Sequence, residues 1–274
     1  MTIEIIPSIA VLGGFGLAFG LFLGFASKKF KVKEDPNVRK IQDVLPGINC
    51  GACGYAGCSA YAEAVVNNKE VPINLCVPGK EAVAKKIGEI LCRECASVRE
   101  ARVARLHCAG GKQEVKNKYK YDGIKTCKSA SALQGGPKDC SFGCIGFGDC
   151  VTACPFDAIH MGDNGLPVVD EKKCVACGKC VAACPKLLFE LVPKKSKVHV
   201  LCSSKDKAPQ VIKACKVGCI GCKRCETVCP VEGKAIHVID NLAVMDYSKC
   251  ISCGKCAEVC PRKIIIDKRK IEKN

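Results

Sequence analysis

The stretch KKCVACGKCVAACPK, residues 172–186, carries four cysteines within eleven positions, and a proline follows the last of them directly. Disulfides among Cys174, Cys177 and Cys180 would close loops so short that they constrain the unfolded chain little. Zinc ribbons use separate C-x2-C pairs, whereas this stretch has a triplet and a fourth cysteine. The pattern therefore indicates a bound cluster of several metal ions rather than disulfides or zinc.

The chain contains this pattern twice, as part of an internal repeat. A second quartet lies in residues 250–260, and each quartet follows a related block, CSFGCIGFGDCVTACP (140–155) or CKVGCIGCKRCETVCP (215–230). Aligned without gaps, these blocks pair Cys140 with Cys215 and place Phe147 where the second copy has Cys222. Upstream of each block, a short β-like run ends at Cys108 or Cys202.

C-x2-C-x2-C-x3-C-P is the spacing of bacterial ferredoxins, which these blocks resemble. In that arrangement three thiolates bind one [4Fe–4S] cluster and the fourth crosses to the other cluster of the pair. In the irregular block we take Cys140 as the substitute for the cysteine missing at Phe147; the alternative is an empty site. The predicted ligand sets are Cys219, Cys222 and Cys225 with Cys260; Cys250, Cys253 and Cys256 with Cys229; Cys174, Cys177 and Cys180 with Cys154; and Cys140, Cys144 and Cys150 with Cys184.

A different cysteine group precedes the repeat. LPGINCGACGYAGC and the downstream NLCVPG supply Cys50, Cys53, Cys58 and Cys76, spaced C-x2-C-x4-C-x17-C. Glycines between the first three cysteines allow a tight loop that wraps three thiolates around one face of a cluster. Helices are expected at residues 59–67 and 81–91, and the four cysteines are predicted to form one complete site.

Six cysteines remain after these assignments, and we predict that four of them hold a sixth cluster. The repeat makes Cys108 and Cys202 counterparts that the two units could bring face to face. The predicted set is Cys108, Cys127, Cys202 and Cys215. A rival set is Cys92, Cys95, Cys108 and Cys127, and a third possibility is that all six thiols are free in a reducing cytoplasm.

Composition supports this interpretation. The 274 residues include 26 cysteines and no tryptophan, so ligated metal has to supply folding free energy that a small aromatic core cannot. The formal charge of +16 at first suggests nucleic-acid binding. A [4Fe–4S]²⁺ core with four thiolates carries −2, so six of them would leave a net charge of about +4. No nucleic-acid partner is therefore expected.

Residues 5–26, IIPSIAVLGGFGLAFGLFLGFA, carry no charge and are long enough to cross a bilayer as a helix. The next residues, SKKFKVK, place four lysines on the C-terminal side. Such a flank predicts a single-pass anchor in the inner (plasma) membrane, with the bulk of the chain on the cytoplasmic side. A cleaved signal peptide would carry its positive charge before the apolar run instead.

No catalytic triad, phosphate loop or dinucleotide fingerprint stands apart from the cysteine motifs. Five or six clusters in one chain are economically explained as a relay that passes single electrons between a donor and an acceptor. Clusters that serve only as structural staples or as a sensor are a second class of function, but six sites in repeated pairs exceed what folding requires.

The order of features is itself specific. An anchor, the LPGINCGACGYAGC domain and the block GGPKDCSFGCIGFGDCVTACPFDAI closely resemble the iron–sulfur B component of the Rnf complexes, in the long form found in anaerobes. The resemblance implies a subunit of an ion-translocating ferredoxin:NAD⁺ oxidoreductase. It also implies three kinds of partner: soluble reduced ferredoxin, the membrane subunits and the flavin-bearing subunits. The alternative is a ferredoxin-like subunit of another membrane oxidoreductase or hydrogenase.

The expected fold is α+β, with two bacterial-ferredoxin-like units that contain short two-stranded sheets. The expected divisions are an anchor (1–27), a linker (28–45), a helical [4Fe–4S] domain (46–100), a first ferredoxin-like unit (101–196) and a second (197–274).

Overall fold

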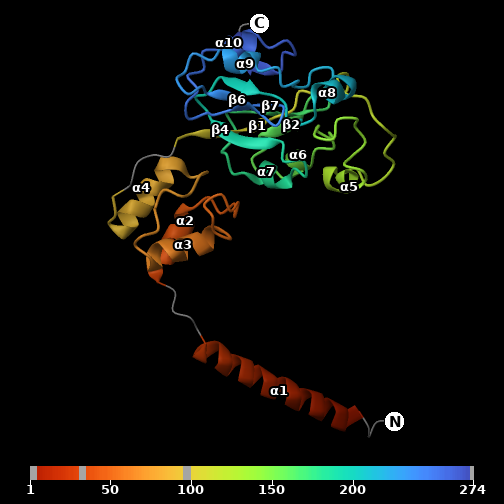
Figure 1. Ribbon diagram of the computed structural model, residues 1–274. Helices are drawn as coiled ribbons and strands as arrows, with labels where there is room; N and C mark the ends of the chain where they lie inside the picture. Colours follow the sequence, from red (N-terminus) through yellow and green to blue (C-terminus); the bar gives the residue numbers. More distant parts are fainter. Residues whose placement is uncertain (1–4, 31–34, 95–99, 272–274) are drawn as a thin grey trace.

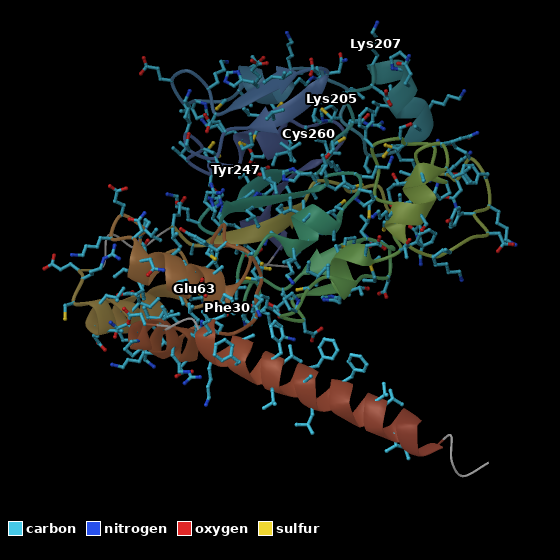
Figure 2. All side chains as sticks on the ribbon, turned by 90° about the horizontal axis from the view of Figure 1, so that it is seen from below. Phe30, Glu63, Lys205, Lys207, Tyr247 and Cys260 are labelled. Carbon is cyan, nitrogen blue, oxygen red and sulfur yellow. The ribbon has the colours of Figure 1, made fainter. Side chains whose placement is uncertain are left out.

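A computed structural model describes residues 5–30, 35–94 and 100–271 of the chain. Its first element, α1 (Ile5–Lys29), stands apart from the other elements (Figure 1), and none of its apolar stretch Val11–Lys29 is buried. Figure 2 shows its side chains projecting freely along the helix as far as Phe30. Leu12 is 73% exposed and Phe22 is 66% exposed, so α1 has the length and the apolar surface that a membrane span requires.

A three-helix domain follows, made of α2 (Pro36–Val44), α3 (Cys58–Asn67) and α4 (Lys80–Leu91). Its core contains Ile41, Tyr61 and Ile87, each at most 1% exposed. The Tyr61 hydroxyl donates a hydrogen bond to the Pro72 carbonyl oxygen at 2.9 Å, which ties α3 to the loop that leads to Cys76.

The predicted linker 28–45 is wrong over its second half, because residues 36–44 form α2. Asp35 caps this helix, accepting a hydrogen bond from the Asn37 amide at 2.8 Å, and Pro36 occupies the first turn. Val38 and Ile41, three residues apart, then face the core of the three-helix domain. The Asp-Pro start and this spacing are helix signals that the sequence already contains.

The first ferredoxin-like unit has two antiparallel two-stranded sheets. Strand β1 (Arg102–Leu106) pairs with β4 (Phe189–Pro193), with Ala104 opposite Leu191, and β2 (Ile159–Met161) pairs with β3 (Pro167–Val169). The short helices α5 (Cys127–Ala132), α6 (Asp149–Thr152) and α7 (Lys179–Ala183) lie between the strands in the chain.

The second unit repeats this plan. Strand β5 (Val198–Val200) pairs with β8 (Ile265–Asp267), and β6 (Ile236–Ile239) pairs with β7 (Leu242–Met245). Its helices are α8 (Ala208–Ala214), α9 (Arg224–Thr227), α10 (Lys255–Glu258) and the terminal α11 (Lys268–Ile271). The expected mixture of helices and strands is therefore observed, and each unit has its own apolar core lined by cysteines.

The two units meet along the segments that follow β1 and β5. The Ala109 amide donates to the Leu201 carbonyl oxygen at 3.0 Å, and the Lys216 amide donates to that of Glu114 at 2.9 Å. A β-bridge between Val115 and Cys215 adds to this junction. These bonds place Cys215 of the second unit against a loop of the first.

Candidate metal centres

The N-terminal site is assembled by the turn that leads into α3. Cys58 is the first residue of this helix, and its amide donates to the Asn49 side-chain oxygen at 2.8 Å. A Cβ at Gly57 would lie 2.8 Å from that same oxygen, so the turn requires glycine there. Burial raises the pKa of the Cys76 thiol, and the thiols nearby raise it further. Those neighbours complete the predicted set of Cys50, Cys53, Cys58 and Cys76.

Two sites in the second unit group the thiols as their spacing predicts. One pocket is lined by three cysteines of the block 215–230 and by the last cysteine of the quartet 250–260. A second pocket is lined by the first three cysteines of that quartet and by the last cysteine of the block. We call the first the open site and the second the terminal site; Cys222 in the first and Cys253 in the second are both exposed. Their thiols are Cys219, Cys222, Cys225 and Cys260 in the open site, and Cys229, Cys250, Cys253 and Cys256 in the terminal site.

The regular quartet of the first unit also has its predicted partner. Burial raises the pKa of Cys177, and the nearby Cys154 and Cys174 thiols raise it further. Burial likewise raises the pKa of Cys180 to about 12, with Cys174 and Cys177 close by. The Ala104 amide of β1 donates to the Cys174 sulfur at 3.5 Å. We call Cys154, Cys174, Cys177 and Cys180 the inner site.

The irregular site differs from the prediction, because Cys127 and not Cys140 completes it. The pocket contains Cys127, Cys144, Cys150 and Cys184, and we call it the covered site. The Asp149 carboxylate accepts hydrogen bonds from the amides of Cys127 at 2.8 Å and Lys128 at 3.0 Å, which fixes the start of α5 beside α6. Phe147 packs against this helix, its ring centroid 5.6 Å from that of Tyr121.

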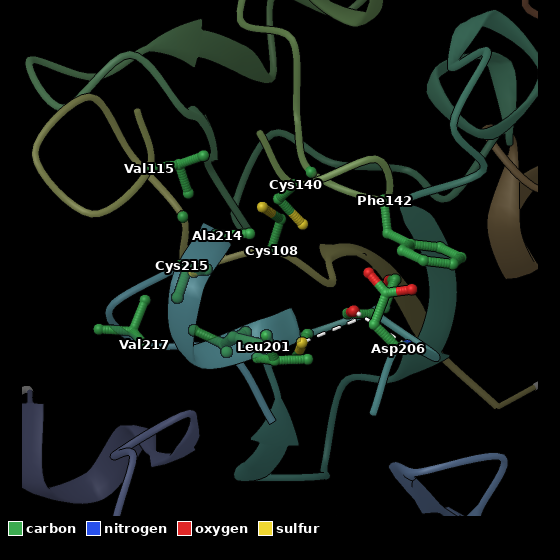
Figure 3. Close-up of a pocket in the computed structure, with 17 residues that line it drawn as sticks. Cys108, Val115, Cys140, Phe142, Leu201, Asp206, Ala214, Cys215 and Val217 are labelled. Carbon is green, nitrogen blue, oxygen red and sulfur yellow. Dashed lines mark hydrogen bonds between the residues drawn. The ribbon is translucent and has the colours of Figure 1, made fainter. Parts of the chain in front are cut away.

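The sixth group also differs from the prediction, because it contains Cys140 in place of Cys127. One pocket at the junction of the two units is lined by Cys108, Cys140, Cys202 and Cys215, and we call it the central site. Figure 3 shows Cys108 and Cys140 side by side in this pocket, with Cys215 on an adjacent segment. Of the rival set, Cys108 and Cys127 line different pockets, Cys92 is exposed at the end of α4, and Cys95 lies outside the described residues.

The internal repeat explains this exchange physically. Cys108 corresponds to Cys202, and Cys140 corresponds to Cys215, so a two-fold-like junction brings both pairs together. Cys127 lies on α5, between Cys108 and Cys140 in the chain, and its thiol lines the covered site instead. The alignment of the repeat already paired Cys140 with Cys215, and that pairing favours Cys140 over Cys127 for the central site.

The chemistry of these pockets suits clusters rather than single ions. In the parts of the chain that the structure describes, no three His, Cys, Asp or Glu side chains form a group that could hold one metal ion. Four of the quartets instead line cavities, and a [4Fe–4S] cluster takes one thiolate at each of four separate irons. Burial raises the pKa of Cys144 and Cys256 to about 12 each, so these thiols would release their protons to solvent when iron binds to their sulfur atoms.

Neighbouring sites touch one another in a fixed succession. The Cys144 amide of the covered site donates to the Cys108 sulfur of the central site at 3.4 Å. The equivalent amide of Cys219, in the open site, donates to the Cys202 sulfur at 3.4 Å. Amide hydrogen bonds to sulfur stabilise negative charge on it and raise a cluster's reduction potential. The central site is thus joined in the same way to one site of each unit.

The other pairs of neighbouring sites are identified by thiols that lie close enough to influence each other's ionisation. After burial, Cys50 of the N-terminal site is one of the neighbours that raise the pKa of Cys177. Cys150 of the covered site acts in the same way on Cys180, and Cys225 of the open site on Cys256. These neighbours give the six groups of thiols the order N-terminal, inner, covered, central, open and terminal.

Comparisons with known proteins match these regions. Residues 45–78 match the family described as "Putative Fe-S cluster", and residues 143–188 and 211–261 each match a family described as "4Fe-4S dicluster domain". The chain is 45% identical to the B component of the ion-translocating oxidoreductase complex of Methanosarcina acetivorans, over 91% of this chain and 93% of that protein.

Two further relatives come from anaerobic bacteria. Identity is 47% to the B component of the proton-translocating ferredoxin:NAD⁺ oxidoreductase complex of Clostridium ljungdahlii, over 89% of this chain and 85% of that protein. It is 41% to the Na⁺-translocating counterpart of Acetobacterium woodii, over 91% of this chain and 74% of that protein. Similarity over this length and at this identity shows that the chain belongs to the family of the B component of the ion-translocating ferredoxin:NAD⁺ oxidoreductase, or Rnf, complexes.

Proposed function

We propose that this chain is the membrane-anchored electron relay of an Rnf complex and that its cysteines bind six [4Fe–4S] clusters in one row. Membership of the family and the two dicluster domains support the electron-transfer role. The observation that carries the row is the contact between successive sites, above all the two 3.4 Å amide-to-sulfur bonds that flank the central site. When bound, each cluster supplies a centre that takes up and releases one electron.

The protein's own contribution is to space and shield these centres. Most of these cysteines are buried or half-buried, and four of the quartets line apolar cavities. Amides such as that of Ala235, which donates to the Cys229 sulfur at 3.3 Å, offset the negative charge of the thiolates. The last cysteine of each ferredoxin-like block or quartet crosses to the other site of its pair, which ties both sites to one core.

The row gives the relay two distinct ends. The N-terminal site belongs to the three-helix domain, which follows α1 in the chain and lies between α1 and the ferredoxin-like units in Figure 1. We assign this end to the membrane and flavin-bearing subunits. The other end belongs to the second unit, where Cys222 and Cys253 are exposed. We assign it to reduced ferredoxin, because exposed thiolates bring a cluster within reach of a soluble donor.

The anchor and domain limits complete this proposal. α1 spans the plasma membrane, and Lys28 and Lys29 in its last turn favour the cytoplasmic side for all that follows. The cluster-binding part then comprises the three-helix domain from residue 36 to about 100, the first unit at 101–196 and the second at 197–274. Ion movement belongs to other subunits, because the chain has one candidate membrane span among its described residues.

Iron and acid-labile sulfide per chain, measured on anaerobically purified protein, test the number of clusters. Six clusters predict about 24 of each per chain, with magnetic interaction between reduced neighbours in the EPR spectrum. Cys202→Ser is expected to lose about four irons, whereas Cys92→Ser keeps them all. A content of about 20 in the unmodified chain would remove the central cluster, and zinc in place of iron would contradict the relay.

A further inference from the structure

Lys138 is a buried cation that the cluster ligands alone do not explain. Its side chain is 8% exposed, and its ammonium donates one hydrogen bond, to the Gly110 carbonyl oxygen at 3.0 Å. Among the described residues no carboxylate lies within ion-pair distance of it. A buried ammonium with one neutral partner is unfavourable unless other negative charge lies close by.

The place of Lys138 identifies that negative charge. Gly110 lines the central site, and a Cβ on it would lie 3.5 Å from the Cys215 sulfur and 3.7 Å from the Cys108 sulfur. The Cys108 sulfur in turn accepts a hydrogen bond from the Cys144 amide of the covered site at 3.4 Å. The ammonium therefore lies at the boundary between the covered and central sites.

The backbone around Lys138 holds it there. Asn117 and Lys138 form a β-bridge, the Lys118 amide donates to the Pro137 carbonyl oxygen, and the Asp139 amide donates to that of Lys116 at 2.9 Å. The lysine is thus presented from a paired segment rather than from a free loop.

The internal repeat provides a natural comparison. In the gapless alignment that pairs Cys140 with Cys215, Lys138 corresponds to Lys213. Lys213 lies in the last turn of α8 and is exposed, so water screens its charge. The first unit therefore has a buried cation beside its block, and the equivalent lysine of the second unit is solvated.

We propose that the buried positive charge of Lys138 raises the reduction potentials of the covered and central clusters relative to the reduction potential of the open cluster. An added electron increases the negative charge on a cluster, and a nearby buried cation offsets that increase. The electron comes from the neighbouring centre in the row, which is oxidised as the next one is reduced, and no proton is required. The lysine thereby favours electron movement from the open site of the second unit into the central and covered sites.

This inference rests on the proposed function, and the test separates the two. The full chain is purified anaerobically as wild type, Lys138→Met, Lys138→Gln, Lys138→Arg and Lys213→Met. Iron is counted first, and the clusters are then titrated with a reductant at controlled potential while EPR is recorded. The iron count reports the clusters themselves, and the midpoint potentials report the lysine.

In Lys138→Met we expect full iron content and at least one reduction step that is about tenfold less favourable, which for one electron is about 59 mV. Lys138→Arg and Lys213→Met should titrate like the wild type. Unchanged potentials in an iron-replete Lys138→Met protein would overturn the proposal. So would loss of iron in both Lys138→Met and Lys138→Gln, because the lysine would then have a structural role. A wild-type chain without the covered or central cluster would instead overturn the proposed function.

Discussion

The two ferredoxin-like units share one plan but protect their equivalent sites differently. In the second unit Cys222 comes from the block itself and remains exposed. In the first unit Phe147 takes that position in the sequence, and the fourth thiol that lines the pocket is that of Cys127, which is 9% exposed on α5. Moving one ligand from a loop to a packed helix shields the site without changing the other three thiols. The exposed Cys222 leaves the open site within reach of a partner protein, whereas the buried Cys127 keeps the covered site inside the molecule, where it can only exchange electrons with neighbouring sites.

The largest expected effect comes from moving the fourth thiol of the covered site from residue 127 to residue 147. Cys127→Ala should lose the covered cluster, about four irons per chain, because the remaining three thiols leave one iron without its ligand. Adding Phe147→Cys to that variant should restore the iron, since residue 147 occupies the position equivalent to Cys222. The measurement is iron content after anaerobic purification.

Cys140→Ala is the matched control for this exchange. Its lost thiol belongs to the central site, so Phe147→Cys should not restore the iron that it loses. Rescue of Cys140→Ala in place of Cys127→Ala would show that the two cysteines are grouped the other way round.

A smaller effect is expected from the carboxylate that holds the packed helix. Asp149→Ala removes two hydrogen bonds from the start of α5, and bonds to a charged acceptor contribute about 1.5–3 kcal/mol each. The cluster should still assemble, but a chelator should extract about four irons faster than from the wild type. Asp157→Ala is the control, because the Asp157 side chain is 91% exposed and its ion pair with Lys173 is at the surface. Equal extraction rates in both variants would contradict the role given to Asp149.

The smallest expected effect concerns acid sensitivity at the β5–β8 sheet of the second unit. Burial lowers the pKa of His199 from 6.5 to about 4, and its Nδ1 lies 3.2 Å from the Tyr247 hydroxyl. Above pH 6.5 the imidazole is neutral in both the folded and the unfolded chain, so it adds no pH dependence there. As the pH falls from 6.5 to about 4, only the unfolded chain gains the proton, and the folded state loses stability.

His199→Phe should therefore flatten the acid-dependent loss of visible cluster absorbance over that interval. His160→Phe, which changes an exposed histidine of the first unit, should leave the curve as it is in the wild type. If both variants bleach identically to the wild type, the burial of His199 does not contribute to acid sensitivity.

Local spacing predicted most of the groups that the structure assembles. The quartet at residues 250–260 and the set around Cys58 follow from a few fixed separations, because short loops leave the thiolates little freedom. The β-like runs that end at Cys108 and Cys202 were also predicted, and β1 and β5 form there.

The errors arose where the ligand is distant in the sequence. Cys127 lies 17 residues before Cys144, on an α5 segment whose place depends on Asp149 and on the packing of Phe147. No fixed spacing encodes such a tertiary contact. The helix α2 was missed for another reason: its polar composition suggested a linker, although the Asp35-Pro36 start and the buried Ile41 were present in the sequence.

The central site also has a consequence for damage and repair. Its thiols come equally from the two units, whereas the four sites within the ferredoxin-like units draw their thiols from a single unit each. Oxidative loss of this one group would remove a cross-link that spans the junction, while each unit kept its own clusters and its own apolar core. The protein would then lose the link between its two ferredoxin-like units, and re-inserting a single cluster would restore that link without refolding either unit.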